Sequence, residues 1–548
     1  MSFPEWEKHV FCVLFFLDGS YNIHMKQSAK SRSQPTKKRP LNGKTTVFTT
    51  ASVVTVLSVF KRGLGFLYRI VLSRLIGAEG VGLHQIAYSV FSVFLTIGAG
   101  GLPVTLTRFI CKSKAEKDAK GESGATAAGL TIGFFISLAL FLIFFPLAKK
   151  CSFLFSDDRA TSVFQILLIS LVIASLYSVL RGNLLGNKRF FTVSLIEIVE
   201  ESLTVIAGVI LLKNANGALD GANRSAWAIV IAYLVCFAIT AVCFLSGGGK
   251  LSSPKNAIKP LLNATIPVTS VRVGGALVNS AVAVLLPVML VRTGLDSVEA
   301  IRQFGAVSGM ATPILFLPAT IIGSLTLVLA PELSGDFYAK RFKRLYKNVQ
   351  RGLCVAFLVA CALLPFFHAL GDKLGALAFS NLLAGELISK GCVVLLPMSL
   401  CMMSTTVLNS MGFEKKTFLF HVIGEAVTLL CVLLLPKFCG VYAFLWGLGL
   451  SNLVTAVCNL LLLHKSCPNF FRIYRRSLFL TCGRAFLIVL PTTLIGKFAV
   501  ALLFGIFGEF LALLLSTLCI AFTLTVFILL SGLVSKRFFR EKFQKMKV

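Results

Sequence analysis

The chain has 548 residues, of which 56% are hydrophobic and 14% charged, whereas about a quarter of residues are charged in an average soluble protein. This composition excludes an ordinary soluble protein and indicates a polytopic membrane protein. The net charge of +31 would suit a nucleic-acid binder. However, the basic residues lie in short loops between apolar segments, where the positive-inside rule and anionic headgroups explain them, so we expect no nucleic-acid partner.

The first 44 residues precede the apolar segments and are predicted to be a basic, disordered, cytoplasmic N-terminus. Residues 10–17 are apolar but too few to span a membrane, and no clear small-residue cleavage site follows them, so neither an anchor nor a signal peptide fits well. Met25 opens the basic part of this segment. Translation from Met1 and translation from Met25 both stay open.

Apolar runs near twenty residues predict about fourteen transmembrane helices, because about twenty apolar residues cross a bilayer. We therefore expect an all-α integral membrane protein. The predicted spans are residues 47–76, 82–107, 125–148, 162–180, 191–212, 226–246, 264–291, 307–331, 352–371, 391–411, 417–436, 439–464, 482–503 and 508–533.

Lys and Arg gather in alternate loops, which predicts the orientation of the chain. With the N-terminus inside, about 36 basic residues lie on the cytoplasmic side against about a dozen outside, a bias strong enough to set topology. We therefore predict that both termini are cytoplasmic.

The first predicted span carries arginines within its apolar stretch. Arg62 lies at its centre, and Arg69 follows seven residues later, close to two helical turns, so both point to nearly the same side. A charge at bilayer depth costs about 3 kcal/mol on insertion scales, so it should face a protein interior or a wet cavity. The pair predicts a cavity that holds an anion. The alternative is a shorter span that ends near Arg62, with its side chain snorkelling to the interface.

Two further arginines join the candidates for substrate binding. Arg272 lies eight residues into the seventh span, with Asn279 two turns further along the same face. Snorkelling explains Arg272 equally well. Arg74 lies near the far end of the first span, where it is either a loop-end charge or the partner of Glu79. Guanidinium groups stay charged and bind phosphate through two parallel hydrogen bonds, which suits pyrophosphate.

Proline and glycine interrupt the second, seventh and eighth spans. Gly101 and Pro103 in the second span and Pro318 in the eighth are candidate gating residues, since transporters use broken helices as gates. The alternative is that they only bend packed helices. The spacing from Arg62 to Pro103 is 41 residues and that from Arg272 to Pro318 is 46, which hints at two related halves.

Acidic residues inside spans are candidates for coupling transport to Na⁺ or H⁺. Glu197, Glu200 and Glu201 cluster on one side of the fifth span, and Glu425 follows His421 by one turn in the eleventh. The alternative for the cluster is structural pairing with Lys188 and Arg189.

The sequence contains no phosphate-binding loop, because residues 247–250 (GGGK) lack the required leading glycine and continue into Leu251. The 15 cysteines are mostly single and lie within apolar runs, without metal-binding or redox spacing. We expect no cofactor, no metal site and no enzymatic activity.

Several motifs resemble the stage V sporulation protein B-like polysaccharide flippases of the multidrug/oligosaccharidyl-lipid/polysaccharide exporter superfamily, which includes the lipid II flippases. These motifs are residues 62–69 (RGLGFLYR), 73–82 (SRLIGAEGVG), 101–103 (GLP), 308–313 (SGMATP), 317–318 (LP) and 330–331 (AP). The resemblance covers about residues 45–535. Arg62 matches the first arginine of the family pattern, Arg69 is displaced from the second by one position, and Pro313 lies near the place of an expected arginine.

The resemblance implies two six-helix lobes and two C-terminal helices around a central cavity. The implied division is an N-lobe at 45–247, a cytoplasmic linker at 248–263, a C-lobe at 264–465, C-terminal helices at 466–535 and a basic tail at 536–548. The implied activity is alternating-access transport of an undecaprenyl-pyrophosphate-linked saccharide, such as lipid II or a spore-cortex precursor, across a bacterial cytoplasmic membrane, with membrane lipids as its surroundings.

Two alternatives within the superfamily stay open. One is a flippase for capsular or other surface-polysaccharide repeat units. The other is a cation-coupled drug exporter, which would favour acidic cavity residues. A membrane glycosyltransferase or polysaccharide ligase fits poorly, because the predicted external loops are short.

Overall fold

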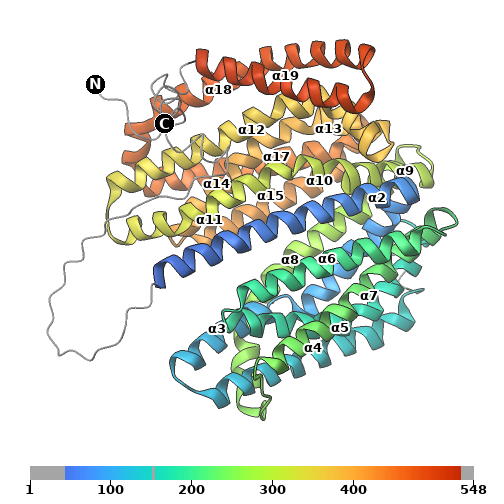
Figure 1. Cartoon of the computed structure of the whole chain (residues 1–548), viewed down its shortest axis with the longest axis vertical. Coiled ribbons are helices and arrows are strands. Elements are labelled where there is room, and N and C mark those ends of the chain that lie inside the picture. Colours follow the sequence, from blue (N-terminus) through green and yellow to red (C-terminus); the bar gives the residue numbers. More distant parts are fainter. Residues whose placement is uncertain (1–42, 151–154, 532–548) are drawn as a thin grey trace, which may run out of the picture.

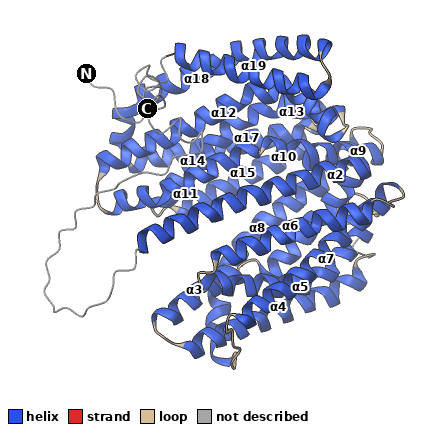
Figure 2. Cartoon of the chain, in the orientation of Figure 1, coloured by secondary structure: helices blue, strands red, loops and turns tan. Residues whose placement is uncertain are grey.

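The computed structural model describes residues 43–150 and 155–531. Every regular element within these ranges is a helix, and no strand occurs among them (Figure 2). This confirms the predicted all-α fold class. Residues 1–42, with both candidate start methionines, and the basic tail at 536–548 lie outside the described residues.

The helices follow one another with short connections. In chain order they are α2 (Gly43–Ala99), α3 (Leu102–Ala115), α4 (Ala119–Leu147), α5 (Ala160–Gly186), α6 (Phe190–Leu212), α7 (Gly217–Ser246), α8 (Lys255–Arg292), α9 (Ser297–Phe304), the π-helix η2 (Gly305–Ala311), α10 (Thr312–Leu315), α11 (Leu317–Tyr338), α12 (Phe342–Phe379), α13 (Leu382–Gly391), the 3₁₀-helix η3 (Cys392–Val394), α14 (Leu395–Ser410), α15 (Glu414–Leu434), α16 (Pro436–Cys439), α17 (Tyr442–Ser466), α18 (Pro468–Ile506) and α19 (Glu509–Leu530).

Figure 1 shows the helices in two groups, with the first part of α2 running between them. One group contains α3 to α7, in blue to green. The other contains α11 to α19, in yellow to red. This arrangement agrees with two bundles of helices on either side of a central region.

The helix α2 contains the first two predicted spans, because the chain reverses inside it at Gly77. The backbone there has φ +68° and ψ 179°, values that glycine adopts far more readily than other residues. Lys61 pairs with Glu197, which also pairs with Arg181, while Pro103 packs against Gly182. Residues 61 and 103 therefore lie at the same end of the bundle, and residues 78–99 run back alongside the first pass.

Twelve segments of the described chain are long and apolar enough to cross a membrane. The first of these, Val56–Ala115, holds both passes of the α2 hairpin. The 23-residue helix α6, which carries three glutamates, is not among the twelve but coincides with the fifth predicted span. Counting the second pass and α6 gives the fourteen predicted spans, and the chain is a multi-pass membrane protein.

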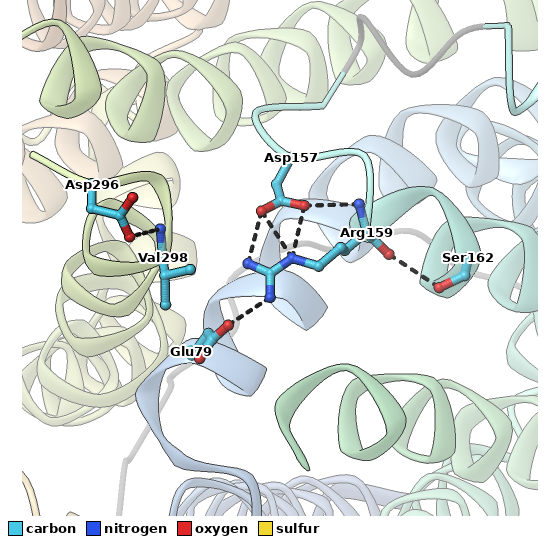
Figure 3. Close-up of polar contacts among 6 residues, drawn as sticks. All are labelled: Glu79, Asp157, Arg159, Ser162, Asp296 and Val298. Atoms are coloured by element: carbon cyan, nitrogen blue, oxygen red, sulfur yellow. Dashed lines mark hydrogen bonds and ion pairs between the residues drawn. The ribbon is translucent and has the colours of Figure 1, made fainter. Parts of the chain in front are cut away.

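The reversal at Gly77 lies at the end of the bundle that is predicted to be external, and we call this the outer end. Arg159, at the start of α5, bonds Glu79 at 2.7 Å and Asp157 at 2.8 Å there, as Figure 3 shows. On the other group of helices, Asp296 caps α9 by accepting a hydrogen bond from the amide of Val298. The opposite, inner end carries Arg108, Arg181 and Lys255, as the predicted cytoplasmic side should.

The apolar cores differ between the two ends. At the outer end one continuous core joins both groups of helices, with buried side chains from α2, α5, α8, η2, α12 and α13. At the inner end one core lies around Leu106 of α3, with Leu261 of α8 packed into it, and a separate core lies around Leu345 of α12 and Val407 of α14. The helices α3–α7 and α11–α19 thus share a core at the outer end and have separate cores at the inner end, where α8 packs with α3, α4 and α5.

Both groups begin with a long helix followed by a broken one. In the first group α2 is interrupted at Gly100 and Gly101 before α3 continues. In the second, α8 is followed by α9, the π-helix η2, α10 and α11, with a break at Phe316. The broken helices meet near the outer end, where Gly82 packs on the carbonyl of Ile301. The relation between two halves that the arginine-to-proline spacing hinted at stays a prediction.

Candidate functional site

Three adjoining cavities lie along the α2 hairpin. The interface chamber, of about 400 Å³, lies between α2, α6 and the α10–α11 break, and its lining includes Arg62 and Thr320. The middle chamber, of about 270 Å³, lies between α2, α6 and α7. The inner chamber, of about 540 Å³, lies between the end of α2, α3, α5 and α8. The middle chamber shares lining residues with each of the other two chambers.

The charges that line these chambers are mostly positive. The basic lining side chains are Lys61, Arg62, Arg69, Arg108, Arg181 and Arg272, and the acidic ones are Glu200 and Glu201. Because low-dielectric surroundings strengthen electrostatic attraction, this excess of cations favours an anionic ligand.

Arg62 and Arg69 both line the interface chamber, so the seven-residue spacing correctly predicted a shared cavity. Both side chains are exposed although they lie inside a long helix. Neither forms a hydrogen bond or ion pair with any residue that the structure describes. Their guanidinium groups are therefore available to a ligand, and their role in binding stays a prediction.

Arg272 lies in the inner chamber and not with Arg62. Its Nη1 donates to the carbonyl oxygen of Gly100 at 2.7 Å, at the interruption between α2 and α3. Asn279 is exposed on α8 and lines none of the three chambers. Of these two residues of α8, only Arg272 lines a chamber, and a role of Asn279 in substrate binding stays a prediction.

Arg74 also lies apart from the chambers. Its guanidinium donates to the carbonyl oxygens of Leu377 and Ala378 at the end of α12. The predicted partner Glu79 bonds Arg159 instead, because the reversal at Gly77 lies between Arg74 and Glu79. A role of Arg74 in substrate binding stays a prediction.

The glutamates of α6 lie beside the chambers and have partners. Glu197 bonds Lys61 at 3.4 Å and Arg181 at 3.1 Å, and Glu200 accepts a hydrogen bond from the Tyr177 hydroxyl at 2.8 Å. Glu201 lines both the middle and the interface chambers. The expected alternative of structural pairing is thus correct for Glu197, but with partners other than Lys188 and Arg189.

Glu425 pairs with His421 at 3.6 Å along α15, as the one-turn spacing predicted. Neither residue lines a chamber. An ion-coupling role for Glu425 would therefore act at a distance from the cationic cavity.

The candidate gating residues lie at the helix breaks. A Cβ at Gly101 would lie 2.4 Å from the Thr269 hydroxyl of α8, so only glycine fits there without movement. Pro103 packs against Gly182 of α5 and lines the inner chamber. Pro318 begins α11, next to Leu317 in the interface chamber. Their gating role stays a prediction.

Sequence reasoning missed Lys61, Arg108 and Arg181 as cavity residues. Arg108 and Arg181 lie near the inner ends of their spans, where the positive-inside rule already explained them. One signal was present: Arg181 and the glutamate Glu197 flank a tight connection between two spans, so their helices had to be neighbours.

The chain is similar to a protein family and to several known proteins. A family model described as polysaccharide biosynthesis protein matches residues 48–336. Stage V sporulation protein B of Bacillus subtilis (strain 168) is 26% identical over 332 residues, which cover 57% of this chain and 63% of that protein. Lipid II flippase MurJ of the same organism is 25% identical over 180 residues, 30% of this chain and 33% of that protein. These alignments span less than two thirds of either relative.

Two solved structures share the fold. Lipid II flippase MurJ in an inward closed conformation has a TM-score of 0.64, 14% identity and coverage of 90% of this chain and 99% of that one. An inward-facing multidrug resistance MATE family transporter of the MOP superfamily has a TM-score of 0.63, 14% identity and coverage of 76% and 99%. At such low identity the likeness shows a common transporter fold.

Proposed function

Because this chain belongs to the polysaccharide biosynthesis protein family, we propose that it is a flippase that moves a polyprenyl-pyrophosphate-linked saccharide across a bacterial cytoplasmic membrane. The protein changes the side of the membrane on which its cargo lies, and no covalent bond of the cargo is made or broken. In this proposal the two lobes, residues 45–247 and 264–465, move relative to each other during transport.

The observation that carries the proposal is the pair of unpartnered arginines in the interface chamber. Arg62 and Arg69 project from one helix into a cavity bordered by both groups of helices. Burying a cation at membrane depth is costly, and a bound anion removes that cost. Planar guanidinium groups form paired, charge-assisted hydrogen bonds with phosphate oxygens, so a pyrophosphate linkage suits the pair.

The packing of the two ends supports alternating access. A single core closes the outer end, whereas at the inner end the core around Leu345 is separate from the core around Leu106. In this state a cargo enters from the inner, cytoplasmic leaflet. Transport then requires the outer core to part and the inner ends to approach one another, which is the rocking motion of transporters with two bundles.

The comparisons favour lipid II or a related cell-wall or spore-cortex precursor as the cargo. One relative is named a lipid II flippase and another a sporulation protein. A flippase for surface-polysaccharide repeat units would use the same mechanism. A drug exporter for organic cations is less well supported, since the chamber linings hold six basic and two acidic side chains.

The experiment that tests the proposal is translocation by the purified protein in proteoliposomes. Fluorescent lipid II placed in one leaflet should move to the other faster than in protein-free liposomes, and faster than an undecaprenyl-pyrophosphate-linked capsular repeat unit. If the capsular repeat unit moves faster than lipid II, the proposed cargo is the capsular repeat unit and not lipid II. If neither substrate moves faster than in protein-free liposomes, the flippase assignment is refuted.

The energy source is proposed to be an ion gradient or the membrane potential. Glu197, Glu200 and Glu201 beside the cavity are the candidates for carrying Na⁺ or H⁺. Transport in ATP-free proteoliposomes should therefore persist while a potential or a Na⁺ gradient is imposed, and should stop when an ionophore collapses both.

A further inference from the structure

We propose that Arg108, Arg181 and Arg272 form a second binding station for a phosphate-type oxyanion, separate from Arg62 and Arg69 and nearer to the inner end. That the natural ligand of this station is the pyrophosphate of the cargo rests on the proposed function. The anion chemistry itself rests on the inner chamber alone.

Three helices bring these arginines to one cavity. Arg108 comes from α3, Arg181 from α5 and Arg272 from α8, and all three line the inner chamber of about 540 Å³. None of them lines the interface chamber that holds Arg62. Guanidinium groups that line one cavity from three different helices can approach a tetrahedral oxyanion from different sides, which a row along one helix cannot do.

Arg181 lines this cavity and keeps one terminal nitrogen without a partner among the described residues. One terminal nitrogen, Nη1, is bonded to Glu197 at 3.1 Å. Its Nε is buried and has no hydrogen-bond partner among the described residues. The other terminal nitrogen, Nη2, forms no hydrogen bond with a described residue, so this nitrogen is the donor of Arg181 that stays available to an anion in the chamber.

The other two arginines keep most of their donors available. Arg108 is exposed in the cavity and forms no hydrogen bond or ion pair with the described part of the chain. Arg272 is exposed and uses only Nη1, on Gly100. The acidic lining residue of the chamber, Glu200, accepts a hydrogen bond from Tyr177. The chamber therefore keeps an excess of positive charge.

The middle chamber lies between this station and the first one. It shares Glu200 and Tyr233 with the inner chamber, and Arg69, Gly65 and Glu201 with the interface chamber. A phosphate group that enters from the inner end meets Arg108, Arg181 and Arg272 first. It then has to pass the middle chamber, whose charged lining residues are Arg69, Glu200 and Glu201, before it meets Arg62.

The test is local protection of a cysteine by inorganic pyrophosphate. Ser178→Cys places a thiol in the inner chamber, and Thr320→Cys places one in the interface chamber. The full-length protein in phosphatidylcholine nanodiscs is alkylated with neutral iodoacetamide, and the modified peptide is quantified by mass spectrometry. A neutral reagent is chosen because its approach does not depend on the arginines, and low salt limits screening.

We expect sodium pyrophosphate to slow the alkylation of Ser178→Cys. Adding Arg108→Gln should raise the pyrophosphate concentration needed for half-protection about tenfold, the size expected for one charge-assisted contact. Arg62→Gln should leave protection of Ser178→Cys unchanged and weaken that of Thr320→Cys.

Arg108→Gln removes no partner from another residue, so it should not disturb the fold, whereas Arg181→Gln would deprive Glu197 of one partner. Lys112→Gln, one turn further along α3 and outside the chamber, is the matched control for surface charge.

A second arm distinguishes the sources of the oxyanion. Protection by pyrophosphate in phosphatidylcholine supports the station with the cargo's pyrophosphate as its ligand. If alkylation is already slow in phosphatidylglycerol nanodiscs without pyrophosphate, the station exists but its ligand is the phosphate of a lipid headgroup. Absence of protection in both arms, or protection that survives Arg108→Gln together with Arg181→Lys, overturns the proposal.

The result is separable from that of the flippase assay. Protection without lipid II movement would keep the oxyanion station and remove the proposed function. Undiminished lipid II movement in Arg108→Gln without any protection would keep the function and remove the station.

Discussion

The Nε of Arg74 donates to the carbonyl oxygen of Ala378 at 2.9 Å, which links α2 directly to the end of α12 in the other group of helices. The same guanidinium also bonds the carbonyl of Leu377. The last carbonyls of a helix carry partial negative charge and lack intrahelical partners, so a cation there both caps α12 and attaches it to α2. This contact lies at the outer end, where one core joins the two groups.

Arg74→Ala should therefore loosen the outer closure. Loss of about 1 kcal/mol of hydrogen bonding would raise the population of outward-open molecules about fivefold. An Ala378→Cys reporter labelled from outside with an impermeant maleimide should react correspondingly faster. Arg292→Ala, an exposed arginine at the same end without a bonded partner in the described chain, should leave the labelling rate unchanged. Equal labelling in both variants would show that Arg74 does not hold the closure.

Arg62→Ala should abolish flipping while expression and membrane insertion stay intact or improve, because a costly intramembrane charge is removed. Arg62→Lys should restore only part of the activity, since an ammonium group cannot form the two-pronged phosphate contact. Lipid II movement in proteoliposomes measures both, with Lys213→Ala as an exposed control. Full activity of a normally inserted Arg62→Ala protein would return this residue to the snorkelling alternative.

Gly65→Ala should impair transport without unfolding the protein. A Cβ at residue 65 would lie 2.6 Å from Oε1 of Glu201, so this carboxylate must move away from the chambers that it lines. Gly63→Ala, two residues earlier on the same helix, meets no atom within 4 Å. Both changes bring a similar gain in helix propensity. Comparison of their flipping rates and Na⁺ or H⁺ dependence therefore isolates the displacement of Glu201. Identical behaviour of the two variants would exclude a role for its position.

Arg159→Ala should lower the thermal unfolding temperature in detergent by a few degrees. Arg159 bonds Asp157 and Glu79 (Figure 3), but its side chain is 34% exposed, so screening limits the loss to about 1 kcal/mol. The hydrogen bond to Asp157, followed by that to Glu79, raises the pKa of Arg159 above its ordinary value. A cation with a raised pKa contributes stability that is lost only as the pH rises through that pKa.

The deficit of Arg159→Ala should accordingly be the same at about pH 6 and about pH 9, both far below the pKa of an arginine. Asp158→Asn, whose side chain is exposed next to this cluster, serves as the control and should unfold like the wild type. A deficit that disappears at the higher pH would mean that another group carries the effect.

The sequence predicted the features that depend on local spacing. Arg62 and Arg69 share a chamber because seven residues return to the same helix face. His421 and Glu425 pair because they are one turn apart. Apolar length located the spans, since the bilayer itself sets that length. These are properties of one helix at a time.

The features that sequence reasoning missed depend on contacts between helices. Lys61 and Arg181 meet at Glu197 although residues 61 and 197 are 136 positions apart. Arg272 shares a chamber with Arg108 and Arg181 because α8 packs beside the α2–α3 break, which no periodicity in α8 records. The pairing of Arg74 with Glu79 failed for a related reason, because a backbone reversal at one glycine separates two residues that are near in sequence.

The reversal at Gly77 also bears on how the protein is made. The first two spans are joined by a single non-helical residue, which leaves no loop to remain outside while the second span is synthesised. The two passes must therefore enter the bilayer together, as a helical hairpin. A span with a central arginine inserts poorly by itself. The second pass, residues 78–99, has largely apolar buried side chains. If both passes insert together, the pass that carries Arg62 enters the bilayer beside this apolar helix. Biogenesis would then depend on a glycine that lines none of the three chambers.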